Sequence, residues 1–469
     1  MQPSTAALNA LTQLWADFNL PSAHLEQLTL TGPAQPLASS FYIGPAAQAS
    51  IASAAAAALL IYQSRCGCVQ HATIDSVKST LECTALFKID GVTPDQWAPL
   101  SGLYKTSDGY IRIHANFDHH RDAALASLDL PCGANTTRQQ VEHRTLQTTS
   151  EQLDAAITRA GGASSVLRTF EQWDRHPQAQ AVASMPVIEL TKIGDADPVP
   201  LPVMARQSAP LHGVRILDLT RILAGPVCGR TLAAYGADVM LVNSPNLPNI
   251  DSIMDTSRGK LSALIDLQTP EGTTTIRQLL KTTRVLVQGY RPGALGRFGL
   301  SAEALAENYP GIITTSLSAY GHSGPWSERR GFDSLVQTAT GFNVAEATAF
   351  GQTTPKAMPV QILDYATGFL MAFASQIALY KQSVEGGSWH AQLSLANTGM
   401  WLRDMGQSLD PLQIEALQID ALQAESQLQV YPSAYGELQA IAHAADFSYT
   451  PPQWKIPSSP PGTHPPQWI

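Results

Sequence analysis

The sequence has few charged residues and a formal charge that is negative rather than positive. Only 14% of its residues are charged, and the net charge at pH 7 is −9. Nucleic-acid binding requires clustered Lys and Arg, so this composition argues against a nucleic-acid partner. Any phosphate that the protein binds must therefore be held by a few local side chains. Because 44% of the residues are hydrophobic, folded structure is expected to dominate.

The sequence also lacks paired cysteines, a basic leader and a long apolar run. Its five cysteines are odd in number and show no CxxC spacing, which argues against a disulfide framework and a metal site. A reducing cytoplasm is the expected location. No basic stretch precedes an apolar run at the N-terminus. The apolar stretch from Ile51 to Tyr62 is shorter than the ~20 residues of a membrane span, so we expect a buried helix there and no membrane partner.

The length of 469 residues exceeds one ordinary hydrophobic core, so several domains are expected. The clearest boundary is the proline-rich run DADPVPLPVMARQSAP, which has no apolar period. We predict an N-terminal helical segment, a partial repeat that includes a smaller domain, a linker, a catalytic domain, and a C-terminal extension with a Pro- and Trp-rich tail. Their boundaries are 1–40, 41–195, 196–211, 212–406 and 407–469.

Strand and helix patterns alternate between residues 211 and 345. GVRILDL reads as a buried strand, a helix follows from Pro226 to Tyr235, and the pattern then continues through the strands ADVMLV, Leu261 to Asp266, RVLVQG and IITTSLSAY. Such alternation is typical of right-handed βαβ crossovers and a parallel sheet. We therefore predict an α/β domain of the nucleotide-binding type.

Two segments of the chain resemble one another. Each has a long apolar helix, a short turn and a strand, which carries His71 in the first copy and His390 in the second. Alignment on Tyr62 and Tyr380 places Ala46 opposite Asp364, so only the second copy keeps a carboxylate. A chance likeness between two Ala-rich helices is the alternative.

The C-terminal tail, SYTPPQWKIPSSPPGTHPPQWI, has too many prolines for a helix or a central strand. Two tryptophans lie within it, and leaving their large apolar rings exposed to solvent would be unfavourable. We expect the tail to run extended over the surface, anchored by Trp454 and Trp468.

Five blocks of the second half carry a family resemblance. They are GVRILDLTRILAGPVCGRTLAAYGADVMLV, LIDLQTPEG, VLVQGYRPGALGRFGL, SLSAYGHSGPWSERRGFDSLVQTATG and PVQILDYATG. In this order they resemble the family III CoA-transferases, from about Gly213 to Gly406. Residues 41 to about 195 resemble a second, partial copy with the small domain of that family, notably at PLSGLYKTSDGYIRIHANFDHH. The resemblance implies a Rossmann-like parallel-sheet domain that binds CoA and a smaller α+β domain.

The resemblance also implies a reaction: CoA moves between carboxylic acids through a covalently bound aspartate, which falls on Asp364. A carboxylate can attack a thioester carbonyl to give an anhydride, and the CoA thiolate can then give an enzyme thioester. Asp364 opens an apolar helix, where the dipole and free N–H groups favour negative charge. The alternative is that Asp364 only caps the helix.

By the same resemblance, CoA binds to the loop after the first strand, Tyr290 stacks on adenine, and Arg297 and Arg330 pair with phosphates. Solvated surface charge is the alternative for these arginines. The substrates would be an acyl-CoA thioester and a carboxylic acid, with no tightly bound cofactor and no metal. The predicted CoA-binding residues are Ile222, Leu223, Ala224, Gly289, Tyr290, Arg297 and Arg330.

The resemblance implies a homodimer with interlocked subunits, and one departure weakens the CoA site. After the strand ADVMLV the family commonly has an acidic and then a basic residue that meets the CoA phosphates, whereas this chain has Asn243 and Ser244. One phosphate contact is therefore missing or supplied from elsewhere. A CoA-binding protein that has lost its activity is one alternative function.

An acyl-CoA racemase is the other alternative. Related racemases use a GHD sequence where this chain has Gly331, Phe332 and Asp333, and Phe cannot carry a proton. His322 and His390 are the candidate substitutes for the missing base.

Two other chemistries are disfavoured. Asp118, His119 and His120 are neighbours, and on a strand they would point to opposite faces and not share a metal ion. The run SLSAYGHSG contains Ser and His but no GxSxG elbow, which argues against a serine hydrolase.

Overall fold

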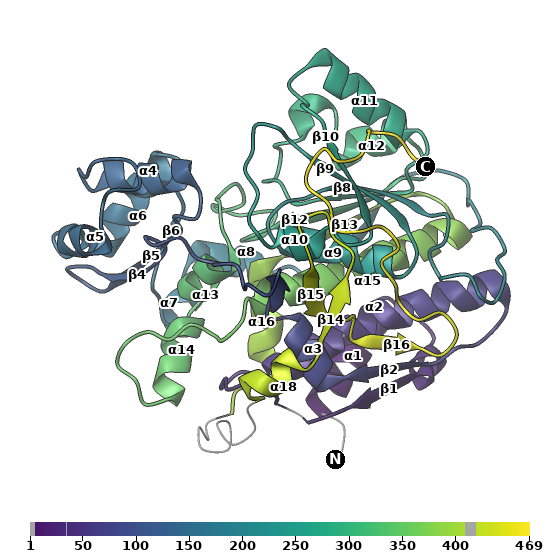
Figure 1. Cartoon of the computed structure of the whole chain (residues 1–469), viewed down its shortest axis with the longest axis horizontal. Helices are drawn as coiled ribbons and strands as arrows, with labels where there is room; N and C mark the ends of the chain where they lie inside the picture. The colour runs from purple at the N-terminus through teal and green to yellow at the C-terminus, as the bar shows by residue number, and fades with distance from the viewer. Residues whose placement is uncertain (1–4, 34, 409–418) are drawn as a thin grey trace.

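A seven-stranded sheet forms the centre of the computed structural model, which describes residues 5–33, 35–408 and 419–469. Neighbouring strands run parallel, except that β7 is antiparallel to β13 (Figure 1). In spatial order the strands are β10 (Lys260–Leu264), β9 (Asp238–Asn243), β8 (Arg215–Leu219), β11 (Val285–Gln288), β12 (Ile313–Ser318), β13 (Ser388–Ser394) and β7 (Glu189–Gly194).

Both faces of this sheet are buried because alternate residues of each strand face opposite sides. In β11, Val285 and Val287 join one apolar core, whereas Leu286 joins another. Ile216 and Leu217 of β8 divide in the same way. The continuous apolar runs of the sequence therefore follow from two-sided burial, and the predicted parallel α/β domain is confirmed.

Helices cover the two faces. On one face, leucines and isoleucine of α11 and α12 share a core with Leu217 and Leu286. On the other face lie α9 and α15, which contact one another. Along the chain the strands of this sheet are followed by α9 (Ala224–Ala234), α10 (Ile253–Thr256), α11 (Pro270–Leu280), the 3-10 turn η2 (Gly296–Phe298), α12 (Ala302–Asn308), α15 (Ile362–Glu385) and α16 (Leu395–Asp404), among other helices.

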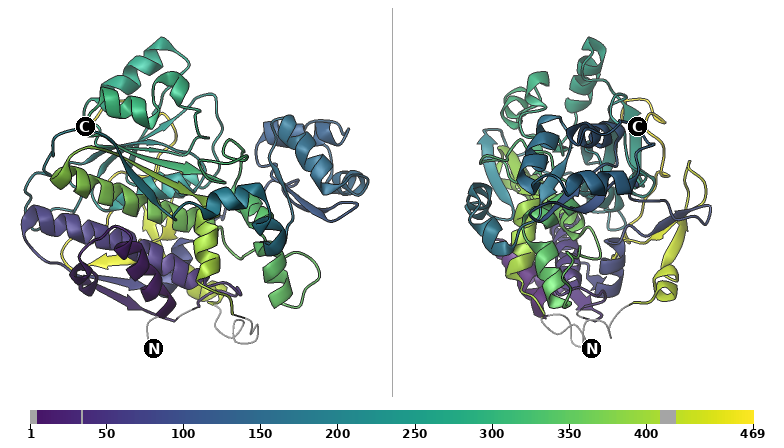
Figure 2. Two further views of the ribbon diagram at one scale, coloured as in Figure 1. Left: turned by 180° about the vertical axis from the view of Figure 1, so that it is seen from behind. Right: turned by 90° about the vertical axis from the view of Figure 1, so that its left-hand side faces the viewer.

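Two 24-residue helices, α15 and α2 (Ile43–Cys66), lie side by side beneath the sheet (Figure 2). Both are apolar and long enough to cross a membrane, yet both are covered inside the protein. The buried helix expected around Ile51 is thus confirmed, and it is longer than the apolar run itself.

The N-terminal region packs around α2, and the C-terminal extension returns to it. Strand β16 joins β2 and β1 in a small sheet, and β14 and β15 pair with β3. The region called helical in the sequence therefore also contains a strand. These elements are α1 (Thr5–Ala16), η1 (Ser22–Gln27), β1 (Leu28–Thr31), β2 (Ala72–Asp75), α3 (Ser76–Glu82), β3 (Phe87–Ile89), α18 (Ala421–Glu425), β14 (Leu428–Tyr431), β15 (Leu438–Ile441) and β16 (Ala445–Phe447).

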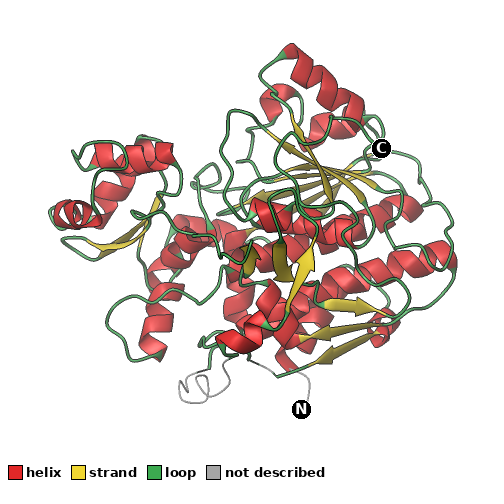
Figure 3. Cartoon of the chain, viewed as in Figure 1, coloured by secondary structure: helices red, strands yellow, loops and turns green. Residues whose placement is uncertain are grey.

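A smaller lobe projects from the main body, and its three strands and their helices stand apart in Figure 3. It has a separate apolar core that includes Tyr104, Ile111, Leu125 and Leu153. Its elements are β4 (Gly102–Lys105), β5 (Tyr110–Ile113), α4 (Asp118–Ser127), α5 (Arg138–Thr145), α6 (Ser150–Arg159) and β6 (Ser164–Val166). The chain returns through α7 (Phe170–Asp174) and α8 (Pro177–Ala183), and α13 (Asp333–Ala339) and α14 (Phe342–Ala349) lie between this lobe and the body.

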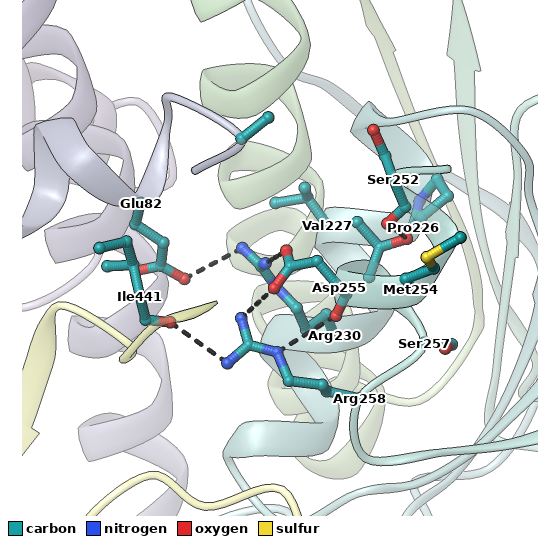
Figure 4. A network of polar contacts seen from close by, with 12 residues as sticks. Glu82, Pro226, Val227, Arg230, Ser252, Met254, Asp255, Ser257, Arg258 and Ile441 are labelled. Carbon is teal, nitrogen blue, oxygen red and sulfur yellow. Dashed lines mark hydrogen bonds and ion pairs between the residues drawn. The ribbon is translucent and has the colours of Figure 1, made fainter. Parts of the chain in front are cut away.

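A buried ionic network fastens α9 to distant parts of the chain (Figure 4). Arg230 of α9 pairs with Asp255 and with Glu82 of α3, and Arg258 pairs with Asp255 at 2.5 Å and donates to the carbonyl of Ile441 at 3.2 Å. Two guanidinium groups thus meet two carboxylates, which offsets the cost of burial. The network holds both the N-terminal region and the C-terminal extension against α9.

The tail behaves as predicted, because residues 450–469 form no helix or strand and two indoles anchor them. Nε1 of Trp454 donates to the carbonyl of Arg230 at 2.9 Å, and Nε1 of Trp468 donates to that of Leu279 at 3.2 Å. The proline-rich run from Asp195 to Pro210 likewise contains no helix or strand.

Candidate active site

A cavity of about 440 Å³ lies at the carboxyl ends of the central strands. The strand order reverses between β8 and β11, and open α/β sheets bind ligands in the crevice at such a point. The structure brings all the predicted site residues to this one cavity. They are Ile222, Leu223, Ala224, Gly289, Tyr290, Arg297, Arg330 and Asp364.

The turn from β8 to α9 forms one wall, and its backbone is strained. Ile222 has a φ of 77°, in the left-handed region that β-branched residues rarely adopt. Gly225 permits the following close approach, because a Cβ there would lie 2.5 Å from the side chain of Thr220. The strain turns α9 so that its first residues face the cavity, and α9 begins at Ala224 rather than at Pro226 as predicted.

A buried ion pair supports this turn from below. Nζ of Lys260 lies 2.8 Å from Oδ2 of Asp218 and donates to the carbonyl of Pro226 at 2.8 Å. The hydroxyl of Thr220 donates to Oδ1 of the same aspartate at 2.5 Å. Burial lowers the pKa of Lys260, and Asp218 opposes that shift. The pair therefore fixes β8, β10 and the start of α9 relative to one another.

Asp364 lies in the first turn of α15 and lines the cavity while only 8% exposed. The residue before this helix is Gln361, and no side chain caps its start, so the interpretation of Asp364 as a simple cap is wrong. Burial raises the pKa of Asp364 well above its usual value, and the charge of Asp333 adds to this, whereas the backbone N–H of Ala224 acts in the opposite direction. The carboxyl group thus faces the start of α9.

Asp333 holds the start of α15 in place. Its Oδ2 accepts the backbone N–H of Asp364 at 2.9 Å, and its Oδ1 accepts the side-chain amide of Gln337 at 2.5 Å. Burial raises the pKa of Asp333 to about 7. Asp333 begins helix α13, so its backbone is helical and not extended.

The smaller lobe supplies the opposite wall through Phe117, His119 and His120. Phe332 stacks on His114, the residue after β5, with ring centres 3.8 Å apart. Burial lowers the pKa of both His114 and His120 to about 3, so these rings are neutral at pH 7. The sequence alone did not predict that these residues line the cavity, although they belong to the small-domain block IRIHANFDHH through which the family resemblance was recognised.

The structure corrects the reasoning about a metal at Asp118, His119 and His120. These residues begin helix α4 and do not lie on a strand. Within residues 5–33, 35–408 and 419–469, no group of three or more His, Cys, Asp or Glu side chains is placed to hold a metal ion.

The two histidines considered as bases lie away from the cavity walls. Nε2 of His322 is 3.0 Å from the carbonyl of Leu393, and Nε2 of His390 is 2.9 Å from the hydroxyl of Ser316. Neither lines the cavity with Asp364. They are therefore poor candidates for an acid/base partner of Asp364.

A family comparison agrees with this site. The sequence model described as CoA-transferase family III matches residues 24–200 and 211–410. The chain belongs to CoA-transferase family III. The two matching segments meet at the cavity, because the first contributes the lobe residues and the second contributes the strand ends and Asp364.

The chain covers only part of each curated relative that it matches. It is 27% identical to an acyl-CoA transferase of Gibberella moniliformis over 67% of this chain and 62% of that protein. It is 32% identical to a succinate–glutarate CoA-transferase of Agrobacterium fabrum over 41% and 52%, respectively. A formyl-CoA:oxalate CoA-transferase of Rhodopseudomonas palustris is 34% identical over 38% and 44%. The chain thus spans about half the length of these relatives.

Among solved structures, a crystal structure of Rv3272 from Mycobacterium tuberculosis is similar in part. It shares 31% sequence identity over 42% of this chain and 56% of that chain, with a TM-score of 0.39. That protein is named a probable fatty acyl-CoA transferase. This chain is 30% identical to it over 41% of this chain's length.

Proposed function

We propose that this family III chain transfers CoA between carboxylic acids and that Asp364 is the nucleophile. The observation that carries the proposal is a carboxyl group at a helix start, open to a cavity whose other walls are the strand ends and the small lobe. The helix dipole of α15 favours the anionic form at this position. The backbone N–H of Ala224 favours it as well.

The proposed reaction has four bond exchanges, two with the donor and two with the acceptor. A carboxylate oxygen of Asp364 attacks the thioester carbonyl, the C–S bond breaks, and the CoA thiolate leaves a mixed anhydride behind. The thiolate attacks the aspartyl carbonyl, which releases the donor acid as a carboxylate and forms an aspartyl–CoA thioester. The acceptor carboxylate then repeats these steps in reverse and carries CoA away.

The raised pKa of Asp364 has a consequence for this chemistry. A carboxyl group that is protonated at rest must lose its proton before it can attack, so the rate should fall on the acid side. Once ionised in a nearly dry site, the carboxylate is held by fixed dipoles rather than by water. We infer that substrate entry and the loss of the proton are linked.

The resemblance favours a homodimer, but this chain has residues of both matching segments at one cavity. We therefore propose that one chain is sufficient for catalysis, whatever its assembly in solution. Light scattering together with activity on dilution tests this. A rate per chain that falls with dilution as a dimer dissociates would contradict it.

Trapping tests the nucleophile. The protein is incubated with an acyl-CoA and then with hydroxylamine, and peptides are analysed by mass spectrometry. We expect a hydroxamate on the peptide that contains Asp364, and none in Asp364→Asn, which keeps the size of the side chain. Labelled CoA should also pass to a free acid. A hydroxamate on another residue, or transfer by the Asn variant at the parent rate, would overturn the mechanism.

Racemisation is the second candidate, because His119 and His120 line the same cavity as Asp364. Racemising the carbon next to a thioester needs a group that takes the proton and another that returns it. Phe332 cannot do either, and the pKa of His120, which burial lowers to about 3, makes this ring a weak base that carries no proton at pH 7. We expect no exchange of the α-proton of a 2-methylacyl-CoA in deuterated water, and rapid deuterium uptake would favour the racemase.

Two further expectations belong to the same proposal. The five cysteines are free thiols, which supports a reducing cytoplasm. The CoA thioester acts as a substrate, and the proposed steps need no tightly bound cofactor.

A further inference from the structure

His120 places a polar ring on the wall of the active-site cavity that the small lobe supplies. The residue lies in the first turn of α4 and is only 4% exposed, yet it lines the same cavity as Asp364. The attack by the Asp364 carboxylate does not itself require this ring. A buried polar group beside a reactive cavity is costly unless a partner satisfies it.

Three aromatic neighbours hold the His120 ring in place. Its centre lies 5.5 Å from that of Phe117, 5.9 Å from that of His114 and 5.8 Å from that of Phe332. All three contacts are edge-to-face. A ring packed in this way has already lost its freedom to rotate, so it can meet a ligand with little further loss of entropy.

The polar atoms of the ring have no partner in the protein. Across residues 5–33, 35–408 and 419–469, neither ring nitrogen of His120 forms a hydrogen bond. Nδ1 is buried, so protein atoms cover it and a ligand does not reach it. Nε2 is therefore the nitrogen that is left to meet a group bound in the cavity.

The ring is a neutral hydrogen-bonding group at pH 7. Burial is the main cause that lowers the pKa of His120 to about 3, and His119, Arg330 and Arg221 add to the shift. A neutral imidazole has one N–H and one bare nitrogen. With the proton on Nε2, it offers a donor to the cavity, and a ligand oxygen can accept this bond.

A short series of contacts links His120 to Asp364. Phe332 lines the cavity and packs edge-to-face against the His120 ring. The next residue is Asp333, whose Oδ2 accepts the backbone N–H of Asp364 at 2.9 Å. The ring and the carboxyl group thus border one part of the cavity, the ring from the small lobe and the carboxyl group from α15.

We propose that Nε2 of His120 donates a hydrogen bond to the acyl carbonyl oxygen while Asp364 attacks the carbonyl carbon. The first and last of the four bond exchanges occur at an acyl carbonyl, and its oxygen becomes negative in the tetrahedral intermediate. A fixed neutral donor stabilises this charge and keeps its own proton throughout. The bond is stronger in the transition state than in the bound substrate, so it accelerates the reaction. The inference rests on the proposed function for the identity of the reacting carbonyl.

Steady-state kinetics of CoA transfer tests this with two variants of the same residue. His120→Phe keeps an aromatic ring for its neighbours but lacks the donor, whereas His120→Gln is neutral and keeps an N–H close to the position of Nε2. His143→Phe is the matched control, because His143 is an exposed histidine of α5 in the same lobe and outside the cavity. Circular dichroism and thermal unfolding check that each variant folds.

We expect His120→Phe to lower kcat about 100-fold and to change the KM of the acyl-CoA by less than about threefold, as the loss of one oxyanion donor does. His120→Gln should retain at least about a tenth of the parent kcat. Hydroxamate formation at Asp364 during hydroxylamine trapping should slow by a similar factor in His120→Phe, because the first bond exchange is affected. His143→Phe should change neither rate.

Three results would overturn the inference and leave the proposed function standing. One is a folded His120→Phe protein with the kcat of the parent. Another is a raised KM with an unchanged kcat, which would assign His120 to binding of the substrate before it reacts. The third is an equal loss in His120→Gln and His120→Phe, which would mean that the donor is not what matters. A parent protein that gives no hydroxamate at Asp364 would instead refute the proposed function.

Discussion

Helices α15 and α2 have the same length and similar composition and lie side by side, but of these two helices only α15 contributes a residue to the active-site cavity. Asp364 in its first turn faces the start of α9. At the aligned position of α2, Ala46 is fully buried among apolar residues. The comparison teaches that a helix start becomes a reactive site through what faces it, here the strained β8–α9 turn, and not through the helix itself.

A buried carboxylate lies near the start of both α15 and α2, and the two carboxylates accept hydrogen bonds from different groups. Asp333 accepts the N–H of Asp364 and leaves the Asp364 carboxyl free. Near the start of α2, Oε2 of Glu346 accepts both the N–H and the hydroxyl of Ser40, at 3.0 and 2.5 Å. The second arrangement fixes the chain and presents no reactive group.

The largest expected effect on activity comes from removing the Asp364 carboxyl group, which makes the start of α15 resemble that of α2. We expect Asp364→Ala to lower the turnover of CoA transfer by at least about a thousandfold, because the variant lacks the carboxylate that we propose as the nucleophile. The variant should remain folded, since it removes a partly desolvated acid without a side-chain partner. Steady-state kinetics and thermal unfolding measure both, and turnover near that of the parent would break the comparison.

The reverse change at α2 should harm the fold and create no second site. Ala46→Asp places a carboxyl group in an apolar core, and we expect the free energy of unfolding to fall by about 3–5 kcal/mol. Urea unfolding measures the loss, with Ala46→Ser as a smaller control. Combined with Asp364→Ala, Ala46→Asp should restore no activity, and any recovery would mean that α2 also has a working site.

A smaller effect is expected at the contact between α15 and α9. A Cβ on Gly368 would lie 2.5 Å from the carbonyl oxygen of Ala224 and 2.8 Å from Val227. Gly368→Ala should therefore destabilise the fold by about 1–3 kcal/mol and weaken CoA binding, because it displaces the β8–α9 turn. The aligned change in α2, Ser50→Ala, removes only a bond to the carbonyl of Ala47 and should cost less than about 1 kcal/mol.

The smallest expected effect concerns pH and Asp333. Its negative charge raises the pKa of Asp364, so Asp333→Asn should move the acid limb of the rate profile to lower pH, by about one unit. Initial rates between pH 4 and 8 measure this. An unmoved acid limb would mean that Asp364 does not sense Asp333.

The same variant tests stability. In the folded parent Asp333 titrates at about 7, above the unfolded value of about 4, so the folded state holds the proton more tightly. The free energy of unfolding of the parent should therefore fall as pH rises from about 4 to 7, and Asp333→Asn should lack this share of the decline. The Asn side chain also loses one of the two accepted hydrogen bonds. Urea unfolding at pH 4, 5.5 and 7 compares the slopes.

Much of the fold was predictable because its strands are buried on both faces and so appear as apolar runs separated by helix signals. The gathering of the predicted site residues followed as well, since the carboxyl ends of parallel strands meet at one edge. Tyr290 and Ile222 lie far apart in the sequence and still share a cavity for this reason.

The features of the site that the sequence did not predict depend on packing between segments that are distant in the chain. No local pattern tells that His120 faces the same cavity as Asp364, because the orientation of the small lobe is set by its contacts with α13. The start of α4 was mistaken for a strand because Asp118 to His120 carry no apolar period. The bond from Asp364 to Asp333 links two helix starts, and sequence alone does not bring those together.

The burial of α2 under α15 has a consequence for biosynthesis. Nearly 300 residues separate the end of α2 from the start of α15, which at about 5–20 residues per second means roughly 15–60 s on the ribosome. During that interval a 24-residue helix, which contains an 18-residue stretch with a mean hydropathy of 1.4, has no α15 to cover it. Its early partners are α1, α3 and the β1–β2 pair, which are close in sequence. The nascent N-terminal region must therefore shelter this helix, by its own collapse or with a chaperone, until the second half emerges.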